Sequence, residues 1–449
     1  MEAFLVSLIF LIPIKDINIK GISPGIEKKL ESLKKEYRGR EANKENLNNL
    51  TEKLTHFFLK EGYPLARIRF TNFEKEKDSL KIVISVSNLK PFIVNDILID
   101  NTLQTKKYIF KRYFDLTGKP FTLDKFMRGK RKIERFSFIN IRSFDLRSYA
   151  GRNYLYLKVY EKPSSNFEIF SSYDNKSKIL KGKIEIEALN LFGDLRSFKI
   201  RWERYTSGKA DFEMSYTEPF IGPFEVSLSP YYLLFQRESL YIKENLGIRL
   251  IYHFEGGNFS ILYDYYEETP FLKNPFYVNS NGSEFVFGKK PFFPEEGAYF
   301  RFSGKVLKSK NISYKGKANI FFMKKIVSIF YSSAEIYSGF LNLKDSLLSE
   351  YFYLGGTKYP RGYSEEDFVS ESFITFIFEE HIRIKNISFF SFLDHSIMRL
   401  ISEDYIHKSG YGIGFIGFTE NLEVKLSLAL PYKEGLNSAK VHFILRNYF

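Results

Sequence analysis

The stretch Ile248-Arg-Leu-Ile-Tyr-His-Phe-Glu-Gly-Gly-Asn-Phe-Ser-Ile-Leu-Tyr-Asp-Tyr265 decides the fold of this chain. Apolar and aromatic residues recur at every second position on both sides of the glycines, and several of the alternate positions carry Arg, His, Ser or Asp. A period of two is that of a β-strand with one apolar face. The short Glu255–Gly256 link between the two runs predicts an antiparallel hairpin.

The same alternation continues from residue 164 to residue 449 and divides into sixteen segments. Aromatic residues make up 18% of the chain, with 48 Phe and 31 Tyr, while the mean hydropathy is only −0.25. Past the N-terminus, no apolar run approaches the roughly 20 residues of a spanning helix. In lipid an open sheet would leave its edge groups without hydrogen bonds, so the sheet must close. Residues 164–449 are therefore predicted to form a sixteen-stranded antiparallel transmembrane β-barrel.

One segment of the barrel, 283–289, has a weak pattern and is included because of parity. With it, the short connections 190–194, 218–223 and 255–256 fall on one side of the membrane. The long connections 268–282 and 340–369 then fall on the other, outer side, as in barrels of this type.

Residues 15–88 and 91–163 precede the barrel and share one order of elements: strand, helix, helix, strand, strand. Pro24 is expected to open the first helix, and Asn43 and Thr122 are suitable caps for later ones. Two copies of a unit of ~75 residues indicate a tandem repeat. The fold class is therefore α+β repeats followed by a barrel.

Three segments make the resemblance of these repeats specific: Glu61-Gly-Tyr-Pro-Leu-Ala-Arg67, Leu116-Thr-Gly-Lys-Pro-Phe-Thr-Leu123 and Val159-Tyr-Glu-Lys-Pro163. They look like POTRA domains, the periplasmic substrate-handling modules of the BamA/TamA superfamily of outer-membrane assembly proteins. The resemblance implies one POTRA domain over 15–88 and a second over 89–163. Each would offer a sheet edge to unfolded client strands, because an unpaired edge can be extended by another chain. The alternative is that the repeats act only as spacers.

The predicted outer loop carries the second resemblance, Tyr353-Leu-Gly-Gly-Thr-Lys-Tyr-Pro-Arg-Gly-Tyr363. It is similar to the superfamily's sixth extracellular loop, in which a Gly-Gly pair precedes an aliphatic-Arg-Gly-aromatic tetrad, although Pro360 replaces the usual Val or Ile. The wall motif Phe-x-Asp-x-Gly is similar to Phe392-Leu-Asp394, with Ser396 in place of Gly. The likeness implies that the loop folds into the lumen. The residues expected to make this loop-to-wall contact are Arg361, Gly362, Tyr363, Phe392 and Asp394, and the loop glycines are Gly355 and Gly356.

The resemblance also implies a function. The chain would lie in the outer membrane of a Gram-negative bacterium with its N-terminal domains in the periplasm, and would insert or translocate polypeptides. Its partners would be unfolded outer-membrane or secreted clients, membrane lipids and, where present, accessory lipoproteins or an inner-membrane protein. Client strands would enter at a lateral seam between the first and last barrel strands, which carries Phe167, Ile169, Phe443, Leu445 and Phe449.

Two other functions stay open at this stage. Two-partner-secretion transporters also have two POTRA domains and export one dedicated client through the lumen; the turn Tyr216-Thr-Glu-Pro-Phe220 favours the assembly branch instead. A passive porin is the more distant alternative.

Enzymatic activity is not expected. The chain contains no Cys, and its six His belong to no nucleophile or metalloprotease motif. Adjacent strand positions face opposite sides, so Glu379-Glu-His381 does not form a metal site. We therefore predict no catalytic residue, metal or cofactor.

The net positive charge belongs to residues 1–163, which hold 33 Lys and Arg against 19 Asp and Glu, whereas the remainder holds 34 of each. Such a charge suits nucleic acid or anionic lipid. We expect no nucleic-acid partner and assign Lys130, Arg131 and Lys132 to a basic patch that faces phospholipid head groups; an ordinary solvated surface is the alternative.

Residues 1–14 resemble the remnant of an export signal, and a buried first strand is the other interpretation.

Residues 15–163 are accordingly predicted to bind anionic liposomes in a salt-sensitive manner. Cosedimentation with phosphatidylglycerol and phosphatidylcholine vesicles at low and high salt checks this. Equal binding to neutral and anionic vesicles would contradict it.

Overall fold

A computed structural model of the chain has two compact units, Met1–Lys162 and Pro163–Phe449. The structure describes residues 12–100, 104–136, 138–162, 165–174, 179–204, 208–221, 225–237, 240–271, 273–288, 290, 293–345, 347–356, 359–364, 366–401, 404–419 and 422–447. Residues 1–11 of the expected export signal and Phe449 of the expected seam lie outside this description. Ile14, at the end of the expected signal, begins a strand and is buried.

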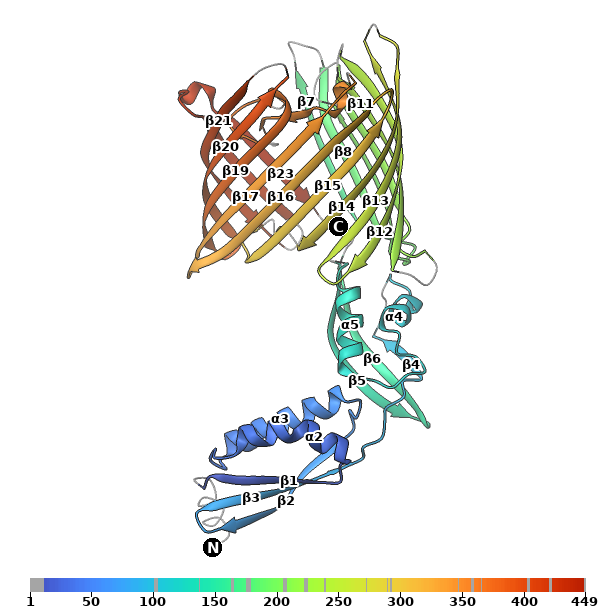
Figure 1. The fold of residues 1–449 in the computed structure, drawn as a ribbon, viewed down its shortest axis with the longest axis vertical. Helices are drawn as coiled ribbons and strands as arrows, with labels where there is room; N and C mark the ends of the chain where they lie inside the picture. Colours follow the sequence, from blue (N-terminus) through green and yellow to red (C-terminus); the bar gives the residue numbers. More distant parts are fainter. Residues whose placement is uncertain are drawn as a thin grey trace. The chain divides into compact units, whose positions relative to one another are not determined.

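The first unit contains two three-stranded sheets with the same connectivity (Figure 1). The first repeat comprises β1 (Ile14–Lys20), α2 (Pro24–Tyr37), α3 (Lys44–Lys60), β2 (Arg67–Glu76) and β3 (Ser79–Ser87), with sheet order β1-β3-β2. The second comprises β4 (Asp96–Ile99), α4 (Lys107–Phe114), α5 (Leu123–Ile133), β5 (Ile139–Tyr149) and β6 (Arg152–Glu161), with order β4-β6-β5. In both, the first strand pairs in parallel with the last. The predicted repeat is thus present.

The helices of the repeats begin where the sequence predicts. Asn43 accepts a hydrogen bond from the backbone N of Asn46 at 2.8 Å, and Thr122 accepts one from the backbone N of Lys125 at 3.3 Å. These caps satisfy amide donors that have no partner within the helix. The apolar stripe of α3, including Leu54 and Phe58, is buried in the core that it shares with the first sheet.

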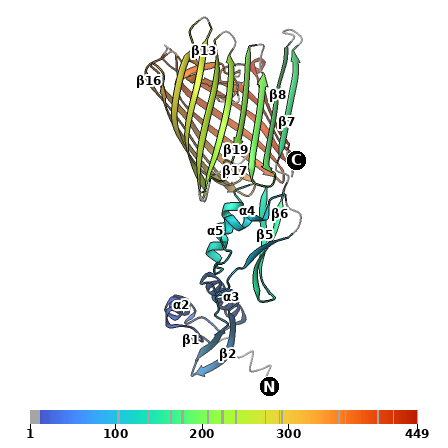
Figure 2. The ribbon, with the colours of Figure 1, turned by 90° about the vertical axis from the view of Figure 1, so that its right-hand side faces the viewer.

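Sixteen long strands in the described part of the second unit close into a barrel, and a seventeenth, very short strand belongs to an inserted loop. The long strands are β7 (Asn166–Asp174), β8 (Ile179–Leu191), β9 (Arg196–Arg204), β10 (Lys209–Thr217), β11 (Val226–Arg237), β12 (Tyr241–Phe254), β13 (Gly257–Pro270), β14 (Phe276–Gly288), β15 (Gly297–Lys308), β16 (Ile312–Val327), β17 (Phe330–Asn342), β19 (Phe368–Ile384), β20 (Ile387–Leu400), β21 (Tyr405–Phe418), β22 (Leu422–Pro431) and β23 (Lys440–Asn447). β23 neighbours β7 and so closes the sheet; Figure 2 shows β7 and β8 side by side in the barrel wall. The predicted antiparallel sixteen-stranded barrel is confirmed.

The hairpin β12–β13 shows that the barrel has an apolar outer face and a polar interior. Ile261 and Tyr263 are 56% and 47% exposed on the outer surface, whereas Ser260 and Asp264 are each 1% exposed on the inner one. Leu250 lies opposite Ile261 in the ladder, so both strands present apolar residues outward. An apolar outer face with polar residues inside is the pattern of a barrel in lipid. Separately, each helix among the described residues is too short or too polar to span a bilayer.

The expected long outer connection 268–282 is wrong. β13 extends to Pro270 and β14 begins at Phe276, so only a short turn joins them. Asn279 and Asn281, which favour loops by composition, are paired opposite Tyr265 and Tyr263 on the outer face. Their backbone groups take part in the ladder, and this outweighs the local preference of Asn for turns.

Candidate functional site

The loop 343–367, between β17 and β19, folds against the inner wall of the barrel. It contains the 3-10 turn η1 (Leu348–Glu350) and the strand β18 (Phe352–Leu354), which pairs with the start of β19. Gly355 and Gly356 follow at φ angles of +111° and +65°. Residues with a Cβ rarely adopt these angles, so the two glycines allow the chain to turn back immediately after β18.

Arg361 lies at the centre of this loop-to-wall contact and is 4% exposed, while its partner Asp394 is 0% exposed. Its Nε and Nη2 donate to the two carboxylate oxygens of Asp394 at 2.8 and 2.6 Å, and its backbone N donates to the same group at 2.9 Å. The guanidinium carbon lies 3.5 Å from the centre of the Phe392 ring. The structure therefore brings together Arg361, Phe392 and Asp394.

Glu379 on β19 is a second partner of Arg361. Its carboxylate accepts from Nη1 of Arg361 at 2.5 Å and lies 3.6 Å from Nζ of Lys425 on β22. Two cations thus face two carboxylates, which limits the cost of burying the charges. Strand alternation predicts that Glu379 lies on the same face as His381. It does not predict that Glu379 pairs with Arg361, which lies 18 residues earlier in the loop.

Room for the loop comes from glycines on β21. A Cβ at Gly410 would overlap the carbonyl oxygen of Arg361, and one at Gly412 would lie 2.7 Å from the Phe392 ring. Any larger side chain at Gly410 would occupy the space of the loop backbone. In the sequence, the sign of this role is that glycines occupy alternate positions of β21: Gly410, Gly412 and Gly414. The sequence does not show which loop or side chain fills the space beside them.

Gly362 and Tyr363 continue the contact toward β22 and β21. Gly362 has a φ angle of +98°, and a Cβ there would lie 2.7 Å from the backbone of Leu430. The Tyr363 hydroxyl donates to the carbonyl oxygen of Ser409 at 3.2 Å. Ser396, which stands where the wall motif has Gly, is buried and shares a hydrogen bond of 2.8 Å with the hydroxyl of Thr375.

Two more anchors hold the loop to other parts of the wall. Glu350 in η1 accepts from Lys243 on β12 at 2.6 Å and from Lys315 on β16 at 3.1 Å. At the far end of the loop, Glu366 lies 3.4 Å from Arg237 on β11. Together with Arg361 on the side of β19 and β20, these contacts fasten the loop to separate arcs of the barrel.

Comparison with known proteins identifies the first repeat and the architecture. Residues 12–85 match the family model "POTRA domain, ShlB-type". The first repeat is a POTRA domain. No protein of curated function matches the sequence.

Solved structures resemble the whole chain. BamA from Haemophilus ducreyi lacking POTRA domains 1–3 is similar over 97% of this chain and 100% of its own, with a TM-score of 0.66 and 15% identity. CdiB from Escherichia coli is similar over 98% of this chain and 90% of its own, with a TM-score of 0.62 and 12% identity. CdiB from Acinetobacter baumannii has the same coverage, a TM-score of 0.56 and 14% identity. The chain therefore has the fold of these structures: α/β repeats, of which the first is a POTRA domain, followed by a sixteen-stranded barrel.

The remaining residues singled out from the sequence lie elsewhere. Phe167 on β7 and Phe443 on β23 are exposed, on the two strands that close the barrel. Ile169 and Leu445 belong to the same strands, but their side chains lie outside the described part. In the predicted basic patch, Lys130 donates to the carbonyl oxygen of Ile141 at 3.0 Å, toward the sheet of its own domain.

Arg361→Ala is predicted to destabilise the barrel by about 3–5 kcal/mol, because Asp394 and Glu379 would lose their partner while staying buried. The midpoint of urea unfolding of the full chain in detergent measures this. Arg399→Ala is the control, since that side chain is 54% exposed in a 3.5 Å ion pair, and we expect a change below about 1 kcal/mol. Equal shifts for the two variants would contradict the prediction.

Gly410→Ala is predicted to displace the loop from the wall, at a cost of roughly 1–3 kcal/mol. Limited proteolysis of residues 343–367 in the folded chain should then become faster. Gly417→Ala on the same strand is the matched control, because a Cβ there meets nothing within 4 Å. Unchanged proteolysis in Gly410→Ala would show that the loop does not need this space.

Proposed function

We propose that the chain is an outer-membrane assembly factor or translocase. Its N-terminal domains, 15–88 and 89–163, would capture unfolded polypeptides in the periplasm of a Gram-negative bacterium, and the barrel, 164–449, would insert or translocate them. No catalysis is required. Among the described residues, no group of three His, Asp or Glu could hold a metal ion.

The observation that carries this proposal is the unequal length of the barrel strands. β7 and β23, which meet where the sheet closes, have nine and eight described residues, whereas β16 and β19 have sixteen and seventeen. β9 and β10 are equally short, with nine residues each, but they are consecutive in the chain and a short connection holds them together. β7 and β23 are the first and last strands of the barrel and lack such a connection, so their few ladder hydrogen bonds make the seam the less costly place to open the wall. Residues 438–449 contain no glycine, so strand length rather than a backbone kink is the basis of this argument.

The inserted loop favours the seam over the lumen as a route into the membrane. To leave the lumen, it would have to break the buried contacts of Arg361, Glu350 and Glu366. Breaking a buried ion pair by removing one partner is strongly unfavourable. The same anchored loop also argues against a passive porin.

A free sheet edge in the first POTRA domain supports the capture of clients. β2 lies at the edge of the sheet β1-β3-β2, and its last six residues are all exposed. An unpaired edge offers backbone N–H and C=O groups to an extended chain. The exposed ring of Phe73, 36% accessible, adds an apolar contact for a client side chain.

A two-partner-secretion transporter is the second candidate. It is favoured by the two repeats of POTRA connectivity that precede the barrel and by the ShlB-type description of the first domain. In that case a single dedicated client would pass through the lumen, and the loop would have to move during export.

Crosslinking from single cysteines distinguishes the two, because the chain has no Cys of its own. Phe167→Cys places a thiol-linked photocrosslinker at the seam, and Ser303→Cys places one on the inner wall. We expect several different barrel clients at the seam and, on the inner wall, only polar segments of those same clients. One secreted client trapped at Ser303→Cys, with nothing at Phe167→Cys, would reject the assembly function in favour of secretion.

A further inference from the structure

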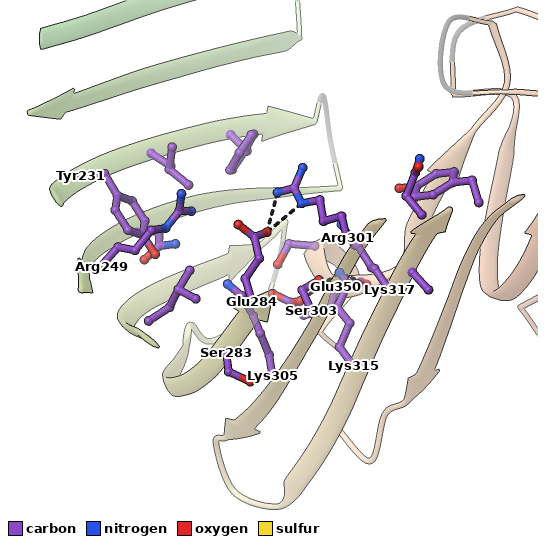
Figure 3. Close-up of a pocket in the computed structure, with 18 of the residues that line it drawn as sticks. Tyr231, Arg249, Ser283, Glu284, Arg301, Ser303, Lys305, Lys315, Lys317 and Glu350 are labelled. Atoms are coloured by element: carbon purple, nitrogen blue, oxygen red, sulfur yellow. Dashed lines mark hydrogen bonds and ion pairs between the residues drawn. The ribbon is translucent and has the colours of Figure 1, made fainter. Parts of the chain in front are cut away.

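A basic cavity of about 530 Å³ lies in the lumen beside the inserted loop. Side chains from neighbouring strands line it, including Arg301 and Lys305 on β15 and Lys315 and Lys317 on β16 (Figure 3). A second cavity of about 520 Å³ shares Lys243, Lys315 and Lys317 with the first and continues along the loop as far as Tyr359. The two cavities therefore adjoin along β16.

This space has more positive than negative charge. Six basic side chains line the first cavity against two carboxylates, and a third carboxylate, Asp264, pairs with Lys305 at 2.7 Å. Arg301 pairs with Glu284 at 2.6 Å. Within the described residues, no carboxylate lies within ion-pairing distance of Lys317 or Arg249. The cavity wall therefore carries three more basic than acidic side chains.

The inserted loop already shows which group the cavity accepts. The carboxylate of Glu350 enters it and accepts hydrogen bonds from Lys243 and Lys315. Lys317 lies two residues beyond Lys315 on the same face of β16, so a second carboxylate on an extended strand could meet it in the same way.

Unpartnered polar atoms indicate that the ligand also donates hydrogen bonds. In the described part of the cavity wall, Oδ1 of Asn245, Oδ1 of Asn319 and Nε of Arg249 are buried without a partner. The orientation of Asn319 follows from its Nδ2, which donates to Glu335 at 2.7 Å. The two oxygens accept hydrogen bonds, which phosphate dianions cannot supply and peptide N–H groups can.

We infer that the luminal cavity binds an acidic stretch of polypeptide, with carboxylates at Lys317 and Arg249 and backbone N–H groups at Asn245 and Asn319. The inference rests on the proposed function and names the class of client segment that enters the lumen. A client that crosses the membrane must move polar segments past an apolar layer, and the lumen is a polar route for them.

The test uses the full folded chain in zwitterionic detergent and a fluorescent hexaglutamate peptide, followed by anisotropy. We expect saturable binding that weakens at high salt. In the double variant Arg249→Gln/Lys317→Gln binding should weaken about tenfold or more, because charge-assisted hydrogen bonds are lost. Lys324→Gln is the matched control, since it lies on the outer face of the same strand, and it should bind as the unmodified chain does.

Hexaglutamine, hexalysine and inorganic pyrophosphate complete the test, and heat-dependent electrophoretic mobility verifies that each variant is folded. Equal binding of hexaglutamine, or unchanged binding in the double variant, would overturn the inference. Binding of pyrophosphate that the double variant loses, without binding of hexaglutamate, would overturn it in favour of a small-oxyanion site. If client crosslinking at Phe167→Cys persists while hexaglutamate fails to bind, only this inference fails; if crosslinking is lost while the peptide binds, only the proposed function fails.

Discussion

A guanidinium buried inside a barrel cannot remain without a countercharge, and the structure around Arg361 depends on this constraint. Two hydrogen bonds from the guanidinium and one from the backbone join it to Asp394, and Glu379 takes a third guanidinium nitrogen. These contacts hold residue 361 against the wall, and the glycines of β21 leave the space that its backbone needs. Because an arginine does not lose its proton in proteins, the contact cannot be relieved by neutralisation.

The closed sheet imposes the second constraint. Every strand has to present apolar residues to lipid and may place charges only in the lumen. The lumen therefore contains ion pairs such as those of Glu350 and Glu284. The loop takes part in several of them, through Glu350, Arg361 and Glu366. One consequence is mechanical: buried charges fasten the loop to the inner wall, whereas the first and last strands, β7 and β23, have only nine and eight described residues. The surplus of cations beside Glu350 leaves a polar surface next to the loop.

Several features could be predicted because they are local. Helix caps at Asn43 and Thr122, the order of elements in the repeats and the alternation of β12 and β13 each depend on neighbours along the chain. The wrong prediction has the opposite character. Asn279 by its own preference belongs in a turn, yet a long ladder with β13 keeps it in a strand. The direction of the Lys130 side chain is a further feature that charge along a helix does not predict.

By itself, the sequence determined that the chain has two α/β repeats and a closed sheet, since residue periodicity and the rule that backbone groups must be paired in lipid need no distant partner. Motif likeness further related the loop around Arg361 to Asp394. Only the tertiary structure decided that Glu379 and Lys425 complete this charge cluster, that Gly410 makes room for the loop, and that Glu350 lies among the lysines of the opposite wall. Those contacts join segments that lie far apart in the chain. Which side chains meet in the lumen depends on strand register and on the path of the loop, and a local sequence pattern predicts neither.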